Sequence, residues 1–171
     1  MRVPRLKELV AAAKAARRRA YCPYSRHPVG AAVLGGSGRL YSGANVENAS
    51  YGLSVCAERI AIFTAVAKGE KEITAVCVVS RSAKPCGACR QVMIEFCGKE
   101  APMVLARLDD STGRQSHAVV RVRSTLPGAF DPLEAGLLPR TPQNLLPSPK
   151  TAARRRPASG RRAKNPSKRS R

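Results

Sequence analysis

The sequence predicts an α/β domain, in which helices cover a central sheet, followed by a basic C-terminal tail. Helical and strand patterns alternate in the order helix, two strands, helix, strand, helix, two strands. Residues 73–80 (ITAVCVVS) form an apolar, largely β-branched run, as in a strand covered on both faces. Beyond residue 139 the composition changes. We therefore expect one domain over residues 1–139 and a tail over residues 140–171.

The first half of the domain predicts a helix, a hairpin and a second helix. Near the N-terminus, apolar residues recur at helical spacing: Leu6, Leu9, Val10, Ala13 and Ala16. Three arginines follow at 17–19, and cations stabilise the C-terminal end of a helix. Residues 28–34 and 39–46 predict two strands around a glycine-rich turn at 35–38. Residues 55–68 predict a helix. Its apolar positions cover much of the helix circumference: Ile60, Phe63 and Ala67 on one stripe, with Ile62 and Val66 beside it. We therefore expect this helix to be mostly buried.

The second half predicts a strand at 73–80, a helix and two further strands. The helix opens at Pro85-Cys86 and ends near Gly98, with Val92, Met93 and Phe96 facing inward. Strands are predicted at 103–108 and 118–122, because the Asp and Gly residues of 109–113 between them are turn formers.

Charge and cysteine usage narrow the class of protein. The formal net charge is +20, and no apolar run reaches the roughly 18 residues of a membrane-spanning helix, so we expect no membrane insertion. The Arg-rich N-terminus faintly suggests a transit peptide, but an amphipathic helix explains its pattern better. Six cysteines without a secretory signal favour a reducing compartment, which predicts the cytoplasm and cysteines that bind metal or do chemistry.

The tail contains 11 Lys/Arg, no acid, five Pro and four Ser. Leu145 and Leu146 are its only large apolar side chains, so burial cannot offset the entropy cost of ordering, and we expect disorder unless a partner orders it. The clusters at 154–156, 161–162 and 168–169 favour non-specific contact with nucleic acid, without aromatic residues for base stacking. The alternative is a solvated tail that keeps the protein soluble; nuclear import is a weaker alternative.

Two segments carry residues suited to metal chemistry. Cys56 opens one predicted helix, and Cys86 and Cys89 lie three residues apart at the start of another. Three thiolates can hold one zinc ion at about 2.3 Å each and leave the fourth tetrahedral position to water, as in catalytic sites. Both helix N-termini favour thiolate over thiol. The spacing therefore predicts an open zinc site.

Glu58 and Arg59 complete the predicted chemistry. Zinc lowers the pKa of its bound water to near neutrality, and a carboxylate beside it, here Glu58, can accept and pass on the proton. Three thiolates over-neutralise Zn²⁺, so a cation near the sulfurs is expected. Arg59 is favoured because it borders both Cys56 and Glu58; Arg90 is as readily an ordinary structural or solvated cation.

Two other interpretations of the cysteines stay open on spacing alone. Cys86 and Cys89 resemble a redox pair, or half of a structural zinc site that takes a fourth protein ligand. The spare thiols and imidazoles are Cys22, Cys77, Cys97, His27 and His117. Cys77 lies in the apolar run and is expected to be a small buried hydrophobe, whereas His117 is expected at the surface.

Cys56-Ala57-Glu58 with Pro85-Cys86-Gly87-Ala88-Cys89 resembles the signature of zinc nucleobase deaminases. More narrowly, the chain resembles the small cytidine deaminases over residues 6–136. The further matching segments are 20–25 (AYCPYS), 28–32 (PVGAA), 45–49 (NVENA), 55–59 (VCAER), 85–92 (PCGACRQV) and 126–130 (LPGAF). The resemblance implies a three-layer α/β/α domain with a mixed sheet of about five strands. It also implies one zinc ion per subunit, hydrolytic deamination of cytidine and deoxycytidine in pyrimidine salvage, and a homotetramer whose active sites each use more than one subunit.

The resemblance also implies roles for individual residues. Asn45 and Glu47 match positions that hydrogen-bond the ribose, and Ala57 matches a backbone contact to the base. Glu58 protonates N3 and then the leaving amine. Phe130 matches an aromatic from a neighbouring subunit, and Tyr51 belongs to the same substrate-contacting set.

Two positions depart from the family pattern. His27 stands where an aromatic usually packs on the pyrimidine, and imidazole offers less stacking area and a titratable proton. Lys84 stands before Pro85, where the family usually has a small residue after a shorter loop. The blasticidin-type aminonucleoside-antibiotic deaminases share the same metal motifs, but Asn45, Glu47 and Phe130 favour cytidine.

Overall fold

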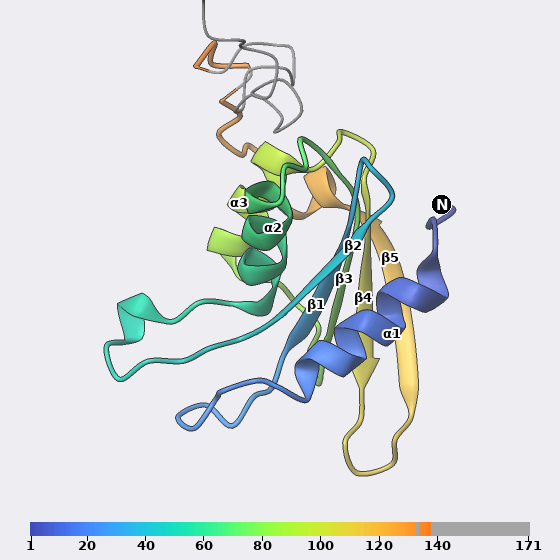
Figure 1. The fold of residues 1–171 in the computed structure, drawn as a ribbon, viewed down its shortest axis with the longest axis vertical. Helices are drawn as coiled ribbons and strands as arrows, with labels where there is room; N and C mark the ends of the chain where they lie inside the picture. The colour runs from blue at the N-terminus through green and yellow to red at the C-terminus, as the bar shows by residue number, and fades with distance from the viewer. Residues whose placement is uncertain (133, 138–171) are drawn as a thin grey trace, which may run out of the picture.

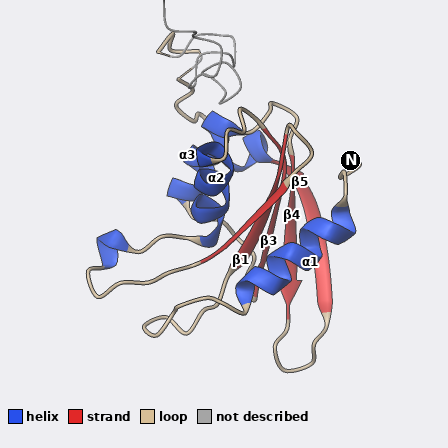
Figure 2. Ribbon diagram, viewed as in Figure 1, coloured by secondary structure: helices blue, strands red, loops and turns tan. Residues whose placement is uncertain are grey.

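The computed structural model describes residues 1–132 and 134–137, which form three layers (Figures 1 and 2). Helix α1 (Leu6–Arg17) covers one face of a five-stranded sheet, and α2 (Ala57–Ala67) and α3 (Gly87–Phe96) cover the other. The predicted α/β/α architecture and element order are confirmed. The predicted tail at 140–171 and the predicted boundary at residue 139 lie outside the described residues.

The sheet is mixed, with strand order β2-β1-β3-β4-β5. Its strands are β1 (Gly30–Gly35), β2 (Leu40–Ala44), β3 (Ile73–Ser80), β4 (Pro102–Leu108) and β5 (Gln115–Arg121). Only the β3–β4 pair is parallel among these neighbours, because α3 connects the two strands as a crossover. The N-terminal ends of α2 and α3 therefore come together on one face of the sheet.

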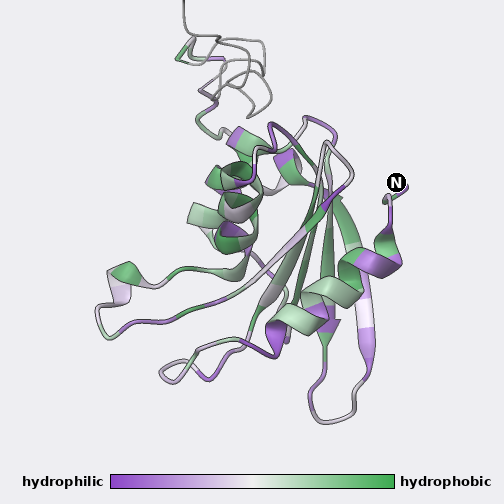
Figure 3. Cartoon of the chain, in the orientation of Figure 1, coloured by the Kyte–Doolittle hydropathy of each residue, from purple (hydrophilic) through white to green (hydrophobic). Residues whose placement is uncertain are grey.

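Strand β3 is buried on both faces, as its apolar run predicts. Val76 and Val78 pack in the core under α2 and α3, and Cys77 and Val79 pack in the core under α1. The central strands are hydrophobic along their length (Figure 3). Cys77 is fully buried and has its pKa raised to about 12 by burial, so it is the small core hydrophobe that was expected.

Two glycines allow helices to approach the sheet closely. A Cβ at Gly30 would overlap the carbonyl oxygen of Ala13 in α1. A Cβ at Gly43 would lie 2.7 Å from the carbonyl oxygen of Ala57 and 2.8 Å from the backbone nitrogen of Ala61 in α2. Gly43 thus fixes the height of the first turn of α2 above the sheet.

The expectation that α2 is mostly buried holds for most of the helix, but it is wrong for Phe63 and Ala67. Ala61, Ile62 and Ala65 are fully buried, but Phe63 is 46% exposed and Ala67 is also exposed. Ala57, Ala61 and Ala65 form the face of α2 that packs closely on the sheet. Phe63 and Ala67 lie on the opposite side of the helix and face solvent. Phe63 is therefore a surface aromatic rather than part of the core.

Two loops project together from one end of the sheet, at residues 18–29 and 45–55 (Figure 1). Tyr21 and Val46 form a bridge between them, and the second loop contains a short 3-10 helix, η1 (Tyr51–Leu53). A second, η2 (Val122–Thr125), follows β5. Within residues 1–132 and 134–137, no helix has the length and apolarity needed to span a membrane.

Candidate zinc and active site

Three cysteines meet where α2 and α3 begin. Cys56 caps α2, Cys86 caps α3, and Cys89 lies in the first turn of α3. The sulfur of Cys86 is 3.8 Å from that of Cys56 and 3.5 Å from that of Cys89, and all three lie within 4.8 Å of one another. Sulfurs about 2.3 Å from one tetrahedral ion are separated by about 3.8 Å. The arrangement fits a zinc ion.

The cluster offers three protein ligands and not four. Among the described residues, no additional His, Cys, Asp or Glu joins the group. His117 is exposed on β5, and Cys77 is buried in β3. A fourth tetrahedral position thus stays open to water, as in catalytic sites. This geometry does not match the structural-zinc alternative.

The environment of the cluster favours thiolate. A hydrogen bond with the Cys89 thiol, aided by Arg59, outweighs burial and lowers the pKa of Cys56 to about 5. The same interaction with Cys56, together with burial, raises the pKa of the Cys89 thiol. The first negative charge therefore forms on Cys56, beside the positive end of α2.

Arg59 lies against the cluster, whereas Arg90 does not. Arg59 Nη2 is 3.7 Å from Cys56 Sγ and donates to the carbonyl oxygen of Ser54 at 3.1 Å. Its Nε is buried and has no hydrogen-bond partner among the described residues. Arg90 instead donates to the carbonyl oxygens of Pro85 and Thr125, each at 2.9 Å. A bound, negatively charged metal–thiolate group would therefore face the Arg59 guanidinium.

Glu58 lies in the first turn of α2 and is 3% exposed. Burial, with the negative charge of Cys56 as a smaller cause, raises the pKa of Glu58 to about 7. A carboxyl group with this pKa is able to accept and donate a proton near neutral pH. Glu58 lines the same pocket as Cys56 and Cys86.

That pocket has a volume of about 420 Å³ and is built from five segments. Its lining comes from the two projecting loops, the start of α2, the end of β3 and the segment before α3: Ser25, His27, Val29, Asn45, Glu47, Cys56, Glu58, Val78, Ser80, Ser82, Lys84 and Cys86. A neighbouring hollow of about 370 Å³ shares Ser25 and Glu47 and adds Tyr24, Tyr51 and Ser54. Together these hollows offer a small-molecule cavity that opens on the cysteine cluster.

Asn45 and Glu47 lie in this cavity, and both also hold the loops together. Asn45 Oδ1 accepts from the backbone nitrogen of Val29 at 2.8 Å, and its Nδ2 donates to the carbonyl oxygen of His27 at 3.1 Å. Glu47 accepts from the Ser25 hydroxyl and, at 3.0 Å, from the backbone nitrogen of Tyr24. One amide hydrogen of Asn45 and further lone pairs of Glu47 stay free for a ligand.

The other predicted substrate-contacting residues lie at different depths. His27 is half-buried, with its Nε2 3.5 Å from Ser82 Oγ. Tyr51 is 75% exposed and stacks edge-on against Tyr24, with ring centroids 5.8 Å apart. Ala57 is fully buried behind the cluster. Phe130 is 59% exposed and does not line the pocket of its own chain.

Comparison with known proteins agrees with this geometry. The profile of the cytidine and deoxycytidylate deaminase zinc-binding region matches residues 4–105. The chain belongs to this deaminase family. The family region is zinc-binding, and Cys56, Cys86 and Cys89 form a group that is able to hold a metal ion, which favours metal binding over the redox-pair interpretation of Cys86 and Cys89.

Several cytidine deaminases are similar to the chain over most of their length. The cytidine deaminase of Sporosarcina psychrophila is 43% identical over 128 residues, covering 73% of this chain and 90% of the relative. That of Halalkalibacterium halodurans is 46% identical over 125 residues, covering 71% and 91%. The crystal structure of cytidine deaminase from Burkholderia pseudomallei superposes with a TM-score of 0.66 at 44% identity, covering 72% of this chain and 98% of that structure.

Some residues of this deaminase site carry no signal in the sequence. Ser80 and Ser82 line the pocket only because β3 ends beside the cluster. Gln91 donates to the carbonyl oxygen of Phe130 at 2.7 Å, and Arg90 links the segment before Cys86 to the end of η2. Two consecutive residues of α3 thus tie the zinc-ligand segment to the segment that carries Phe130.

Proposed function

We propose that the protein catalyses hydrolytic deamination of cytidine and deoxycytidine to uridine and deoxyuridine, with release of ammonia, in pyrimidine salvage. One observation carries the proposal: the buried carboxyl group of Glu58 lines the same pocket as Cys56 and Cys86 of the three-cysteine cluster. Membership of the deaminase family and similarity to proteins named cytidine deaminase support it.

The chemistry assigns Glu58 the proton transfers. Cys56, Cys86 and Cys89 would hold a zinc ion, which would supply Lewis acidity and so lower the pKa of the attacking water. Glu58 accepts a proton as the water oxygen attacks C4 of cytosine, and it donates that proton to N3. It then passes the second water proton to the amino group as the C4–N bond breaks. Ammonia leaves, and the water oxygen stays as the C4 carbonyl of uridine.

We assign binding of the nucleoside to the loop residues. Asn45 and Glu47 offer a donor and an acceptor to the ribose hydroxyls, and both are held by hydrogen bonds to neighbouring backbone. His27 packs against the pyrimidine, and the backbone of Ala57 contacts the base. Arg59 acts on the cluster through Cys56.

We further propose that the protein is a homotetramer that completes each site between subunits. Support comes from exposed apolar side chains around the site, on the projecting loops and the C-terminal segment: Tyr21, Tyr24, Val46, Tyr51, Leu53 and Phe130. Phe130 would reach the substrate of a neighbouring subunit, whereas Tyr51 lines the cavity of its own chain. Light scattering at assay concentration tests this, and a stable monomer would contradict it.

The tail and the cellular location form a separate proposal. Residues 1–139 act as the catalytic domain, and residues 140–171, with 11 Lys/Arg and no acid, contact nucleic acid non-specifically. Deleting residues 140–171 is expected to abolish a salt-sensitive gel shift and to leave deamination intact. An unchanged shift would contradict a role for the tail. Because the thiolate site requires reduced cysteines, we place the enzyme in the cytoplasm.

The deciding experiment measures ammonia release from cytidine and deoxycytidine by the zinc-loaded full-length protein. Blasticidin S and adenosine serve as alternative substrates, and chelator-treated protein is the control. Turnover of either cytosine nucleoside that is lost on chelation and regained with zinc supports the proposal. Turnover of blasticidin S alone would favour the antibiotic deaminases, and zinc-loaded protein without any turnover would contradict the assignment.

A further inference from the structure

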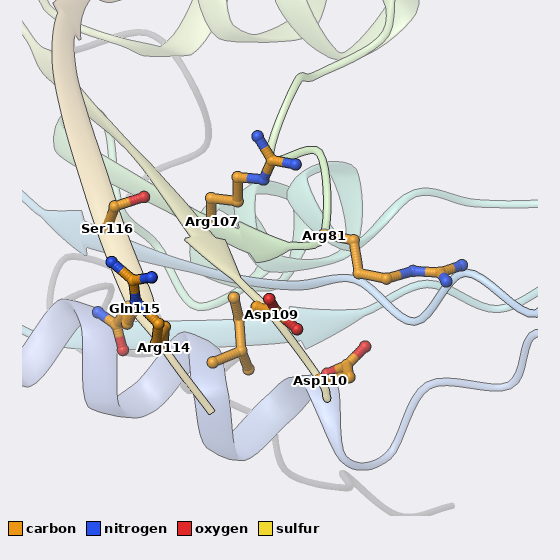
Figure 4. Close-up of a pocket in the computed structure, with 8 residues that line it drawn as sticks. Arg81, Arg107, Asp109, Asp110, Arg114, Gln115 and Ser116 are labelled. Carbon is orange, nitrogen blue, oxygen red and sulfur yellow. The ribbon is translucent and has the colours of Figure 1, made fainter. Parts of the chain in front are cut away.

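A separate hollow, of about 560 Å³, lies at the end of the β4–β5 hairpin. Three arginines line it, from the end of β3, the end of β4 and the hairpin turn: Arg81, Arg107 and Arg114 (Figure 4). Gln115 and Ser116 add polar groups from β5. Its volume falls in the range of small-molecule sites, which is roughly 300–1,000 Å³. The residues of this hollow do not overlap with those around the cysteine cluster.

The guanidinium groups of this hollow have unused hydrogen-bond donors. Within the part of the chain that the structure describes, the side chains of Arg107 and Arg114 have no hydrogen-bond or ion-pair partner. Arg81 donates one N–H to the carbonyl oxygen of Arg26 at 3.3 Å. Each guanidinium carries five N–H donors in a planar fork. Arg81 also interacts electrostatically with Asp110, so the positive charges left for a bound anion to offset are mainly those of Arg107 and Arg114.

Two aspartates also line the hollow, and both already have partners. Asp110 pairs with Arg17 of α1 at 2.6 Å, and this contact lowers the pKa of Asp110. Asp109 accepts hydrogen bonds within its turn from Ser111 and Thr112, which lower its pKa to about 2. These carboxylates therefore stabilise the hairpin turn and the packing of α1, and the guanidinium of Arg107 or Arg114 pairs with neither.

We propose that this hollow binds a phosphate group, with Arg81, Arg107 and Arg114 as its ligands. Phosphate fits because it presents several oxygens and up to two negative charges, which match planar guanidinium forks in bidentate pairs. A single carboxylate would leave most of these donors unused. The proposal concerns a site that the deamination chemistry does not require.

The register of the sheet places this site next to the active pocket. Arg107 pairs across β4 with Ser80 of β3 on one side and with Ser116 of β5 on the other. Ser80 lines the active pocket, and Arg81 follows it directly in the chain. Because neighbouring strands lie about 4.8 Å apart, the backbones of Arg107 and Ser116 lie about 5 and 10 Å from that of Ser80. A phosphate bound by Arg107 would lie beside the pocket and outside it.

The test is calorimetric titration of the zinc-loaded full-length protein with inorganic pyrophosphate, at about 0.05 M and about 0.15 M salt. The double variant Arg107→Gln/Arg114→Gln is expected to bind about tenfold more weakly or worse. Arg2→Gln, which removes one positive charge at the other end of α1, is the control for loss of charge away from the hollow and keeps the affinity of the parent. The basic tail is present in every protein, so its weak binding to anions is common to all.

A charge-conserving variant and a second ligand make the result specific. Arg107→Lys keeps the charge but loses the planar fork, so its affinity is expected between those of the parent and the double variant. Uridine 5′-diphosphate, which has no amine to release, tests a nucleotide as the source of the phosphate. Loss of affinity for both ligands in the double variant supports a nucleotide site, and loss for pyrophosphate alone supports a site for free phosphate. Equal affinities of the double variant and Arg2→Gln for both ligands would overturn the proposal.

Discussion

Arg59 Nη2 lies 3.7 Å from the sulfur of Cys56. It also donates a hydrogen bond, at 3.1 Å, to the carbonyl oxygen of Ser54, which lies two residues before Cys56. One guanidinium thus joins a zinc ligand to the loop that precedes it. Three thiolates give a zinc site a net charge of −1, and the positive charge of Arg59 offsets it. We therefore expect this contact to influence how strongly the sulfurs bind a metal ion and how acidic a water molecule at the fourth position becomes.

Replacing Arg59 is therefore expected to weaken zinc binding. Arg59→Gln removes the charge beside Cys56, and zinc affinity should fall about 10- to 100-fold. Competition against a chromogenic chelator measures this, and circular dichroism checks folding. Arg121→Gln, an exposed arginine on β5, is the control. Unchanged zinc affinity in Arg59→Gln, with normal folding, would remove Arg59 from the metal site.

Glu58 is expected to separate metal binding from turnover. Glu58→Ala and Glu58→Gln keep the three cysteines, so zinc content should stay near one ion per subunit. Turnover should fall at least about 10²- to 10⁴-fold, because the other carboxyl group among the described residues that line this pocket, Glu47, is held by hydrogen bonds to Tyr24 and Ser25. Glu95→Gln on the exposed side of α3 is the matched control. Near-normal ammonia release by zinc-loaded Glu58→Ala would refute the assignment.

Local sequence patterns predicted the helices, strands and cysteine cluster because each depends on residues close together in the chain. Cys56, Cys86 and Cys89 lie at the N-terminal ends of two helices, and these helix starts can be predicted without knowing the order of the strands in the sheet. Which face of α2 is buried depends instead on how closely the helix approaches the sheet. Periodicity alone therefore put Phe63 in the core, although it is 46% exposed.

Contacts between segments that are far apart in the chain could not be predicted from local sequence patterns. The two hydrogen bonds of Asn45 with the backbone at Val29 and His27 follow from the crossing of two loops. The arginine hollow needs the parallel pairing of β3 with β4, which brings residues 81 and 107 together from opposite sides of α3. Neither arrangement can be deduced from spacing along the chain.

His27 is expected to limit the affinity for the base. His27→Phe restores the aromatic area that the family usually has, and KM for cytidine should fall about two- to tenfold with little change in kcat. Steady-state kinetics on cytidine and deoxycytidine measure the effect. His117→Phe, on the exposed strand β5, is the control. A rise in KM for His27→Phe would mean that the imidazole makes a polar contact to substrate, for which its position 3.5 Å from Ser82 Oγ is suited.

Glu70 is expected to make stability depend on pH. Its side chain is 4% exposed and accepts hydrogen bonds from the Ser37 hydroxyl, the Ser37 backbone at 3.1 Å and Tyr41 at 2.8 Å. Burial opposes ionisation, but these bonds and Arg39 outweigh it and lower the pKa of Glu70. A lowered pKa adds stability above the unfolded-state value of about 4.3, and this stability is lost as pH falls through the folded-state pKa.

Urea unfolding of the parent and Glu70→Ala measures this contribution. The variant removes the buried acceptor of three hydrogen bonds from Ser37 and Tyr41, so its free energy of unfolding should be lower by about 1–3 kcal/mol at pH 7. The difference should shrink below about pH 4.3. Glu95→Ala should show neither effect. A difference that stays constant down to acid pH would show that Glu70 stabilises through packing and not through its charge.

Gly43 connects the sheet to the reacting groups. A Cβ there would lie 2.7 Å from the carbonyl oxygen of Ala57, between Cys56 and Glu58, and 2.8 Å from the Ala61 nitrogen. Both atoms belong to the backbone of α2, so the first turn of the helix must move away from the sheet in Gly43→Ala. Overpacking of this kind costs about 1–3 kcal/mol of stability.

The displacement should cost more in activity than in stability, because it moves a zinc ligand and the acid/base group together relative to Cys86 and Cys89. A shift of about 1 Å at a reacting centre is enough to lower kcat about 10²-fold. Gly52→Ala, in the exposed loop, has no atom within 4 Å of the added Cβ and is the control. If Gly43→Ala retained parental kcat and thermal stability, the close packing of α2 on β2 would not be what positions Glu58.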